Sequence, residues 1–209
     1  MQIKSFLLPI VAALLTSVSA ADSSNKCSFS KTSITEATGI SQLNACSTLD
    51  GEITVSGSGI GSIDLSSVKV LKAKLSILNS PSIVSLNFNQ LQNITGALVI
   101  NNATQLNSID LTQLTNVETL QLVSLPSFAI LNLNQGVQKA GTIVLSDTAL
   151  TNLNGLSSFN TIDSININNN KNISKIEFND LQTVTDSLIL SFNNDDAEVK
   201  LDSLKWAGN

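Results

Sequence analysis

Apolar and polar residues alternate in short units that recur along the chain at nearly constant intervals. The first unit has the form apolar-x-apolar, and successive units begin 22, 23, 22, 23, 22 and 23 residues apart. Its seven occurrences are Ile53/Val55, Leu75/Ile77, Leu98/Ile100, Leu120/Leu122, Ile143/Leu145, Ile165/Ile167 and Leu188/Leu190. Alternation with period two predicts β-strands, and seven occurrences at one period predict a repeat protein.

A second apolar-x-apolar unit follows 10 or 11 residues after the first in most repeats. It comprises Ile63/Leu65, Leu86/Phe88, Ile109/Leu111, Leu131/Leu133, Ile176/Phe178 and Val199/Leu201. The fifth repeat is looser, with Leu153 followed by Asn154-Gly155-Leu156. Because one repeat cannot bury its own apolar face, the repeats must stack. We therefore predict an all-β fold, a right-handed parallel β-solenoid of about seven turns of 22–23 residues over 51–209.

The residues between and beyond the repeats predict corners and ends. Small polar residues suited to turns follow the first unit, at Gly57, Asn79, Asn102, Ser124, Asp147 and Asn169. Residues 21–50 are predicted to form an N-terminal cap, and Trp206 is predicted to pack at the other end of the core. No comparable cap follows the last repeat, so we expect an uncapped C-terminal end. That end indicates a shortened version of a longer solenoid or possible end-to-end self-association.

Residues 1–20 have the layout of a secretory signal peptide, with a basic start, an apolar run and small residues before Ala21. The sequence therefore predicts a secreted, extracellular protein without a transmembrane span. In an oxidising compartment Cys27 and Cys46 are expected to form one disulfide, and the alternative is two free buried thiols. Export also makes the acceptor motifs at Asn93, Asn102 and Asn172 candidate N-glycosylation sites.

Charge excludes one class of partner. Removing the leader takes one of the 11 lysines, so 10 lysines face 16 Asp and Glu and the mature net charge is about −6. The chain has no arginine, and nucleic acid is an unexpected partner because phosphate binding needs a basic stripe. It has no histidine either, so the cysteines have no metal-site spacing, and we expect neither a metal nor a cofactor.

Four segments of the chain resemble a known family. The cap segment Cys27…Cys46-Ser-Thr-Leu-Asp-Gly-Glu-Ile-Thr-Val55, the segments Gly96–Asn102 and Ile165–Asn170, and the terminal Leu204–Asn209 are similar to the fungal GPI-anchored cell-wall organisation proteins, relatives of sporulation-specific wall proteins. The resemblance implies receptor L-domain-like leucine-rich repeats and a non-catalytic role in wall integrity. Family members usually carry a C-terminal hydrophobic tail that a GPI anchor replaces, and this chain shows no such signal.

The outward positions of the second unit are where surface chemistry could lie. These positions form one row, and the outward positions two residues later form a parallel row. Together the two rows supply a possible glycan-contact face: Asp64, Asn87, Asp110, Asn132, Asn134 and Glu177. On stacked turns Asp64 and Asp110 would lie roughly 9.6 Å apart, which suits an inverting glycosidase. The simpler interpretation is that these residues are solvent-facing strand positions. An ice-binding solenoid is not favoured, because the first unit's outward row is not a regular threonine ladder: Thr54, Ser76, Val99, Gln121, Val144, Asn166 and Ile189.

We therefore predict a cell-surface protein that acts in fungal cell-wall organisation as a scaffold or contact, without catalysis. Its expected partners are wall polysaccharide or wall proteins. The alternatives are a soluble glycan-binding surface protein and, less favoured, a β-helix polysaccharide-degrading enzyme.

Overall fold

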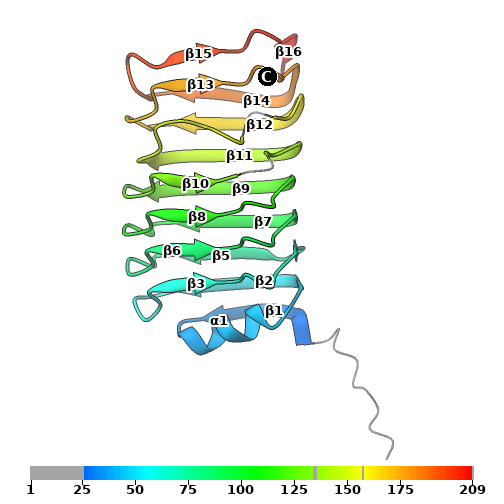
Figure 1. The fold of residues 1–209 in the computed structure, drawn as a ribbon, viewed down its shortest axis with the longest axis vertical. Coiled ribbons are helices and arrows are strands. Elements are labelled where there is room, and N and C mark those ends of the chain that lie inside the picture. Colours follow the sequence, from blue (N-terminus) through cyan, green and yellow to red (C-terminus); the bar gives the residue numbers. More distant parts are fainter. Residues whose placement is uncertain (1–25, 134–135, 157, 209) are drawn as a thin grey trace, which may run out of the picture.

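The chain forms a parallel β-solenoid of about eight turns with one short helix (Figure 1). A computed structural model describes residues 26–133, 136–156 and 158–208. The predicted signal peptide and Asn134 lie outside these described residues. Parallel β-solenoid architecture, predicted from the repeat period, is confirmed.

Three sheets line the coil. The long-strand sheet contains β1 (Ser28–Ile34), β2 (Thr48–Ser56), β4 (Val70–Leu71), β5 (Lys74–Leu78), β7 (Asn93–Asn101), β9 (Asn116–Leu125), β11 (Lys139–Thr148), β12 (Thr161–Asn168), β14 (Thr183–Ser191) and β16 (Trp206–Ala207). The short-strand sheet contains β3 (Ser62–Asp64), β6 (Ser85–Asn87), β8 (Ser108–Asp110) and β10 (Ile130–Asn132). A two-stranded sheet, β13 (Lys175–Glu177) with β15 (Glu198–Lys200), lies further along the coil.

The predicted repeat period matches the register of the stacked strands, because each residue of the first apolar column pairs with the residue 22 or 23 positions later. Ile53 pairs with Leu75, Leu75 with Leu98, and Leu98 with Leu120, and the same column continues through Ile143 and Ile165 to Leu188. Because a shift by one residue would turn every apolar side chain outward, burial of this column holds the register. Leu98 and Leu120 are fully buried, and the column forms one continuous core with the other inward positions.

The strands of the long-strand sheet begin earlier than the sequence predicted. In the middle turns a second paired segment precedes the first apolar unit, and its inward residues Leu71, Ile94 and Val117 are buried. The ladder is irregular between Ile94 and Ala97, where Gly96 lies. A Cβ on Gly96 would be 2.3 Å from the Lys72 carbonyl oxygen, so the close approach of the two backbones there requires glycine.

The predicted corner residues adopt the left-handed conformation that turns the chain. Positive φ angles occur at Asn79, Asn102, Ser124, Asp147 and Asn169, between 51° and 58°, and at Gly57, at 100°. Asn, Asp and Gly tolerate this conformation better than most residues. Lys31 and Phe192 share it, which their residue types did not predict.

Ser124 allows a test of this corner requirement. We expect Ser124→Val to lower the free energy of unfolding by about 1–2 kcal/mol, because a β-branched side chain is strained at positive φ. Ser124→Gly should leave stability equal or slightly higher. Urea unfolding followed by circular dichroism measures both, and equal stability of the two variants would contradict the assigned conformation.

The irregular fifth repeat has a structural counterpart. Residues 149–156 contain no strand, so the short-strand sheet ends at β10, and among the described strands β13 pairs with β15 alone. Leu153 and Leu156 remain buried and keep the core continuous. The two-stranded sheet is therefore separated from the short-strand sheet by one turn that has no short strand.

The N-terminal cap is itself a turn of the coil. β1 pairs in parallel with β2, and α1 (Ala37–Asn44) packs where later turns have a short strand, burying Ile40 and Leu43 (Figure 1). This extra turn explains the count of about eight rather than seven. A disulfide joins Cys27 and Cys46, with a Cα–Cα distance of 5.8 Å.

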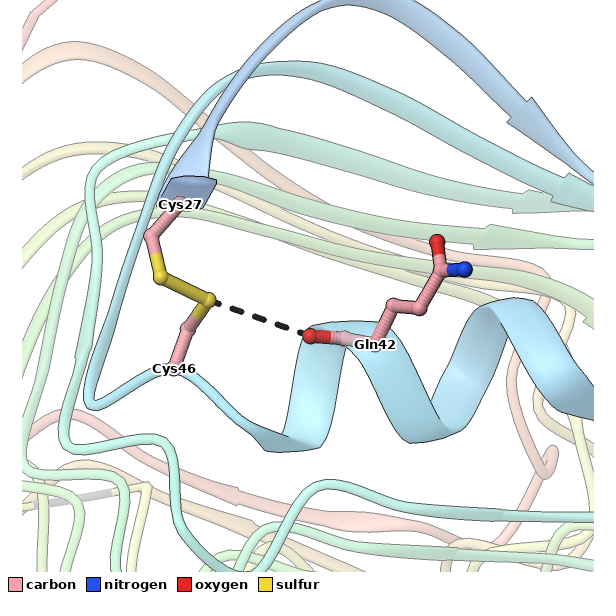
Figure 2. Close-up of a disulfide and its surroundings, with 3 residues drawn as sticks. All are labelled: Cys27, Gln42 and Cys46. Atoms are coloured by element: carbon pink, nitrogen blue, oxygen red, sulfur yellow. Dashed lines mark hydrogen bonds between the residues drawn. A yellow bond between two sulfur atoms is a disulfide. The ribbon is translucent and has the colours of Figure 1, made fainter. Parts of the chain in front are cut away.

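The disulfide ties the start of β1 to the end of α1. Figure 2 shows the Cys46 sulfur near the carbonyl oxygen of Gln42, at 3.8 Å. This is a contact rather than a hydrogen bond, because a disulfide sulfur has no proton to donate. The bridge holds the helix against the first stacked strands.

Polar side chains replace apolar ones in one inward column of the later turns. Asn170, fully buried, accepts hydrogen bonds from the Thr148 backbone N–H and hydroxyl at 3.1 and 2.6 Å. Its amide donates to the backbone carbonyl of Leu145 at 3.0 Å and to Asn193 Oδ1 at 3.2 Å. Asn193 in turn donates to the Ile167 carbonyl oxygen. The cluster satisfies buried polar groups across three turns.

The last described turn exposes apolar surface. Phe192, Val199 and Trp206 are 78%, 49% and 62% exposed. The prediction that Trp206 packs at the end of the core is wrong, because Trp206 pairs with Thr183 at a partly exposed outward position of the long-strand sheet. Its side chain therefore follows the outward column of that sheet rather than the inward one.

Candidate functional site

The outward row singled out in the sequence is assembled by the short-strand sheet. Asp64 pairs with Asn87, Asn87 with Asp110, and Asp110 with Asn132 on neighbouring parallel strands. Asp64 and Asp110 are thus two turns apart, with Asn87 between them. Glu177 lies on β13, beyond the turn that lacks a short strand, so it does not continue this row directly.

Most of this row binds its own backbone. Asp64 Oδ1 accepts from the Ser66 N–H at 3.1 Å, Asn87 Oδ1 from the Asn89 N–H at 3.2 Å, and Asp110 Oδ1 from the Thr112 N–H at 3.1 Å. Asn87 also donates its amide to Asp64 Oδ1 at 3.1 Å. These are Asx turns that end each short strand. The residues therefore have a structural role at the strand ends.

The two candidate carboxylates do not share a cavity. Asp64 borders a hollow of about 430 Å³ between α1 and β3, which Ile40, Asn44 and Ser62 also line. Asp110 is not among the residues that line it. In general acid–base catalysis, the acid and the base must both reach the reacting groups of one bound substrate. The geometry gives Asp64 and Asp110 no common enclosure in which to do so.

Glu177 belongs to a group of ion pairs on the two-stranded sheet. Its carboxylate lies 2.7 Å from the Lys175 ammonium and 3.3 Å from that of Lys200, and Lys200 also lies 3.0 Å from Glu198. The hydrogen bond from Lys175 lowers the pKa of Glu177, partial desolvation opposes this, and Lys200 lowers it further. Glu198 and then Glu177 raise the pKa of Lys200.

These ion pairs predict a loss of stability in acid. Because the pKa of Glu177 is lowered in the fold, its contribution is present above the unfolded-state pKa and is lost as the pH falls through the folded-state pKa. We expect the unfolding midpoint of the protein to fall more than that of Glu177→Gln between about pH 6 and pH 3. Thermal unfolding at several pH values measures this, and parallel curves would contradict it.

The three glycosylation motifs lie in different settings. Asn102 is exposed at a corner and donates its amide to Asn79 Oδ1 at 2.8 Å. Asn172 is exposed in the loop before β13. Asn93 is half-buried in β7, and its Oδ1 accepts from Asn116 at 2.6 Å. Their occupancy stays a prediction.

Among the residues that the structure describes, no group of three or more His, Cys, Asp or Glu is placed to hold a metal ion. In the same part of the chain, no helix has the length and apolarity needed to span a membrane.

Comparison with known proteins identifies the family. The chain is 99% identical, over all 209 of its residues, to "Cell surface GPI-anchored protein ECM33" of Candida albicans, and covers 51% of that protein. It is 33% identical to "Cell wall mannoprotein PST1" of Saccharomyces cerevisiae over 170 residues, which are 81% of the chain and 37% of the relative. The chain belongs to this fungal cell-surface and cell-wall protein family.

The family also includes "Sporulation-specific protein 2" of Saccharomyces cerevisiae, 30% identical over 165 residues, or 78% of the chain and 32% of the relative. The predicted family and its cell-surface location are therefore confirmed. These relatives are named without an enzyme activity. The chain spans between about a third and about half of the length of these three relatives.

Two further comparisons return nothing. No protein-family model matches the chain. No solved structure matches it.

Proposed function

We propose that this chain contributes to fungal cell-wall organisation as a non-catalytic scaffold or contact protein at the cell surface. The observation that supports this most is its family, whose members are named as cell-surface and cell-wall proteins. The fold suits such a role, because stacked parallel strands form a stiff body that presents flat faces.

The absence of catalysis is part of the proposal. Asp64, Asn87 and Asp110 hold their own strand ends, and the two carboxylates border no common hollow. A catalytic pair would need groups free to exchange protons with a substrate. The enzyme alternative is therefore less well supported than a scaffold.

A complementation experiment tests both parts. In a fungal strain that lacks its own relative, expression of this chain should restore resistance of the wall to a glucan-hydrolysing enzyme, with the full-length relative as reference. The Asp64→Asn/Asp110→Asn variant should restore it equally, because an asparagine Oδ1 keeps each Asx turn. No restoration by the unaltered chain would contradict the wall function, and loss only in the variant would favour an enzyme.

A further inference from the structure

We propose that one face of the long-strand sheet binds a neutral β-linked glucan chain. This neutral face consists of the outward residues of five stacked segments, 97–101, 119–123, 142–146, 164–168 and 187–191. The choice of a glucan as the ligand rests on the proposed function in the cell wall. The face itself is defined by the structure and differs from the row on the short-strand sheet.

Charge is kept to the borders of this face. None of its five segments contains an ionisable residue, although the chain has 11 lysines and 16 Asp and Glu. Glu118 and Asp163 precede their segments, and Asp147 follows its segment at a corner. Asp186 lies at the same border, where its carboxylate accepts a hydrogen bond from the Ser164 hydroxyl at 2.8 Å. An uncharged surface matches an uncharged polymer, since no ion must lose its water when the two meet.

The side chains on the face offer the contacts that a sugar chain uses. Val99 and Val144 present aliphatic surface for the C–H groups of sugar rings, and both are half-buried. Gln121 lies directly opposite Val99 and Val144 on the neighbouring strands. Its side chain makes no hydrogen bond to any described residue, in contrast with Asp64, Asn87 and Asp110. A glutamine amide both donates and accepts, as sugar hydroxyls do.

A second amide lies further along the face. Asn168 donates to Asn166 Oδ1 at 2.6 Å and accepts from the Ser146 hydroxyl at 2.7 Å. These bonds fix the orientation of the Asn166 amide and so define which of its groups faces outward. The acceptor residues Asn93 and Asn102 both lie outside the face, since Asn93 precedes segment 97–101 and Asn102 follows it.

The size of the face argues against another protein as its occupant. Five strands about 4.8 Å apart, each with five residues of about 3.3 Å, cover roughly 400 Å². A stable protein interface buries about 800 Å² on each partner. A second copy of this chain would therefore bind too weakly through this face alone. A polysaccharide chain is narrow enough to use it fully.

The shape of the face favours a glucan over an N-acetylated sugar polymer. An acetamido group fits best in a recess, and none of the five hollows at the cap, around the fifth turn and at the last turn is lined by an outward residue of the face, although the inward Leu190 borders one of them. Side chains as small as Ala97, Thr119 and Thr142 keep one edge of the face flat. Flat rings without such a substituent fit this edge.

The experiment compares two variants with the same change in charge. Gln121→Lys/Val144→Lys places two lysines on directly paired, half-buried positions of the neutral face. Ser85→Lys/Ser108→Lys places two lysines on directly paired, half-buried positions of the short-strand sheet. The secreted chain is mixed with insoluble β-linked glucan particles, and the retained fraction is measured over a range of particle concentrations.

We expect the unaltered chain and the short-strand variant to be retained alike. The neutral-face variant should bind at least about tenfold more weakly, because a lysine at the contact must lose its water. Thermal unfolding verifies that both variants fold. If the neutral-face variant does not fold, Asn166→Asp adds a charge to the same face and keeps its Oδ1 acceptor.

Three results would overturn the inference. The first two are no retention of the unaltered chain and equal retention of both variants. The third is retention on chitin particles that equals retention on glucan particles and falls to the same extent in the neutral-face variant. A dimer in solution that the neutral-face variant separates would also overturn it, because the face would then bind a second copy. Failure of this inference is distinct from failure of the proposed function. Restored wall resistance without glucan retention overturns only the neutral face, whereas no restored resistance overturns the wall function whatever the particles show.

Discussion

Replacing Asn170 with alanine is expected to lower the free energy of unfolding by about 3–5 kcal/mol, because each buried polar group left without a partner costs about 1–3 kcal/mol. The Thr148 N–H and hydroxyl and the Leu145 carbonyl would all lose their partner. Urea unfolding followed by circular dichroism measures the change. Asn160→Ala, at an exposed position 10 residues earlier in the chain, is the matched control and should cost little.

A double variant separates lost hydrogen bonds from lost volume. In earlier turns the same inward column is occupied by Ala103 and Leu125, so an apolar column is compatible with the fold. Thr148→Val/Asn170→Leu removes both partners of the strongest contacts and should cost less than the sum of the two single changes. Additive costs, or a stable Asn170→Ala, would show that the buried cluster does not hold these turns together.

Removing the disulfide is expected to cost about 3 kcal/mol. Cys27 and Cys46 are 19 residues apart, and a closed loop of about this length restricts the unfolded chain and so raises its free energy by that amount in the chain-entropy model. The Cys27→Ala/Cys46→Ala variant should therefore unfold at lower urea concentration. Reduction of the unaltered chain with a thiol should give the same midpoint, and an unchanged midpoint in both would contradict the prediction.

The location of this loss is also predictable. Each turn of a solenoid contacts its neighbours only, so loosening the cap should act on the first turns. Amide hydrogen exchange should become faster in α1 and β1, whereas β12 and β14 should keep the protection of the unaltered chain. Faster exchange throughout the coil would show that the cap nucleates the whole structure rather than closing one end.

The repeat period allowed most of the fold to be predicted. Every step of 22 or 23 residues between first units is a pair of stacked strands, from Ile53 with Leu75 to Ile165 with Leu188. The corner residues were recognisable because few residue types tolerate positive φ. The early part of each long strand was missed, because its apolar column, with Leu71 and Ile94, has only one inward residue in each turn and so no alternation to detect.

The candidate site was less predictable. Residue types placed Asp64 and Asp110 on one face correctly, yet whether a carboxylate is available depends on the turn that follows it, here the Asx turns to Ser66 and Thr112. The neutral face had a signal in the sequence, since the row with Val99, Gln121 and Val144 has no charge. The absence of charge in one row does not show by itself that neighbouring rows join it in one face, because that depends on how the turns stack.

The sequence by itself determined the period, the strands, the corners, the cysteine pair and the family, because each of these depends on residues close together or on a strict repeat. The tertiary structure alone decided which outward groups bind the chain's own backbone, which amides are buried between turns and which rows form one face. Those features join residues about 22 residues apart, such as Thr148 and Asn170, and their contacts exist only once the turns have stacked.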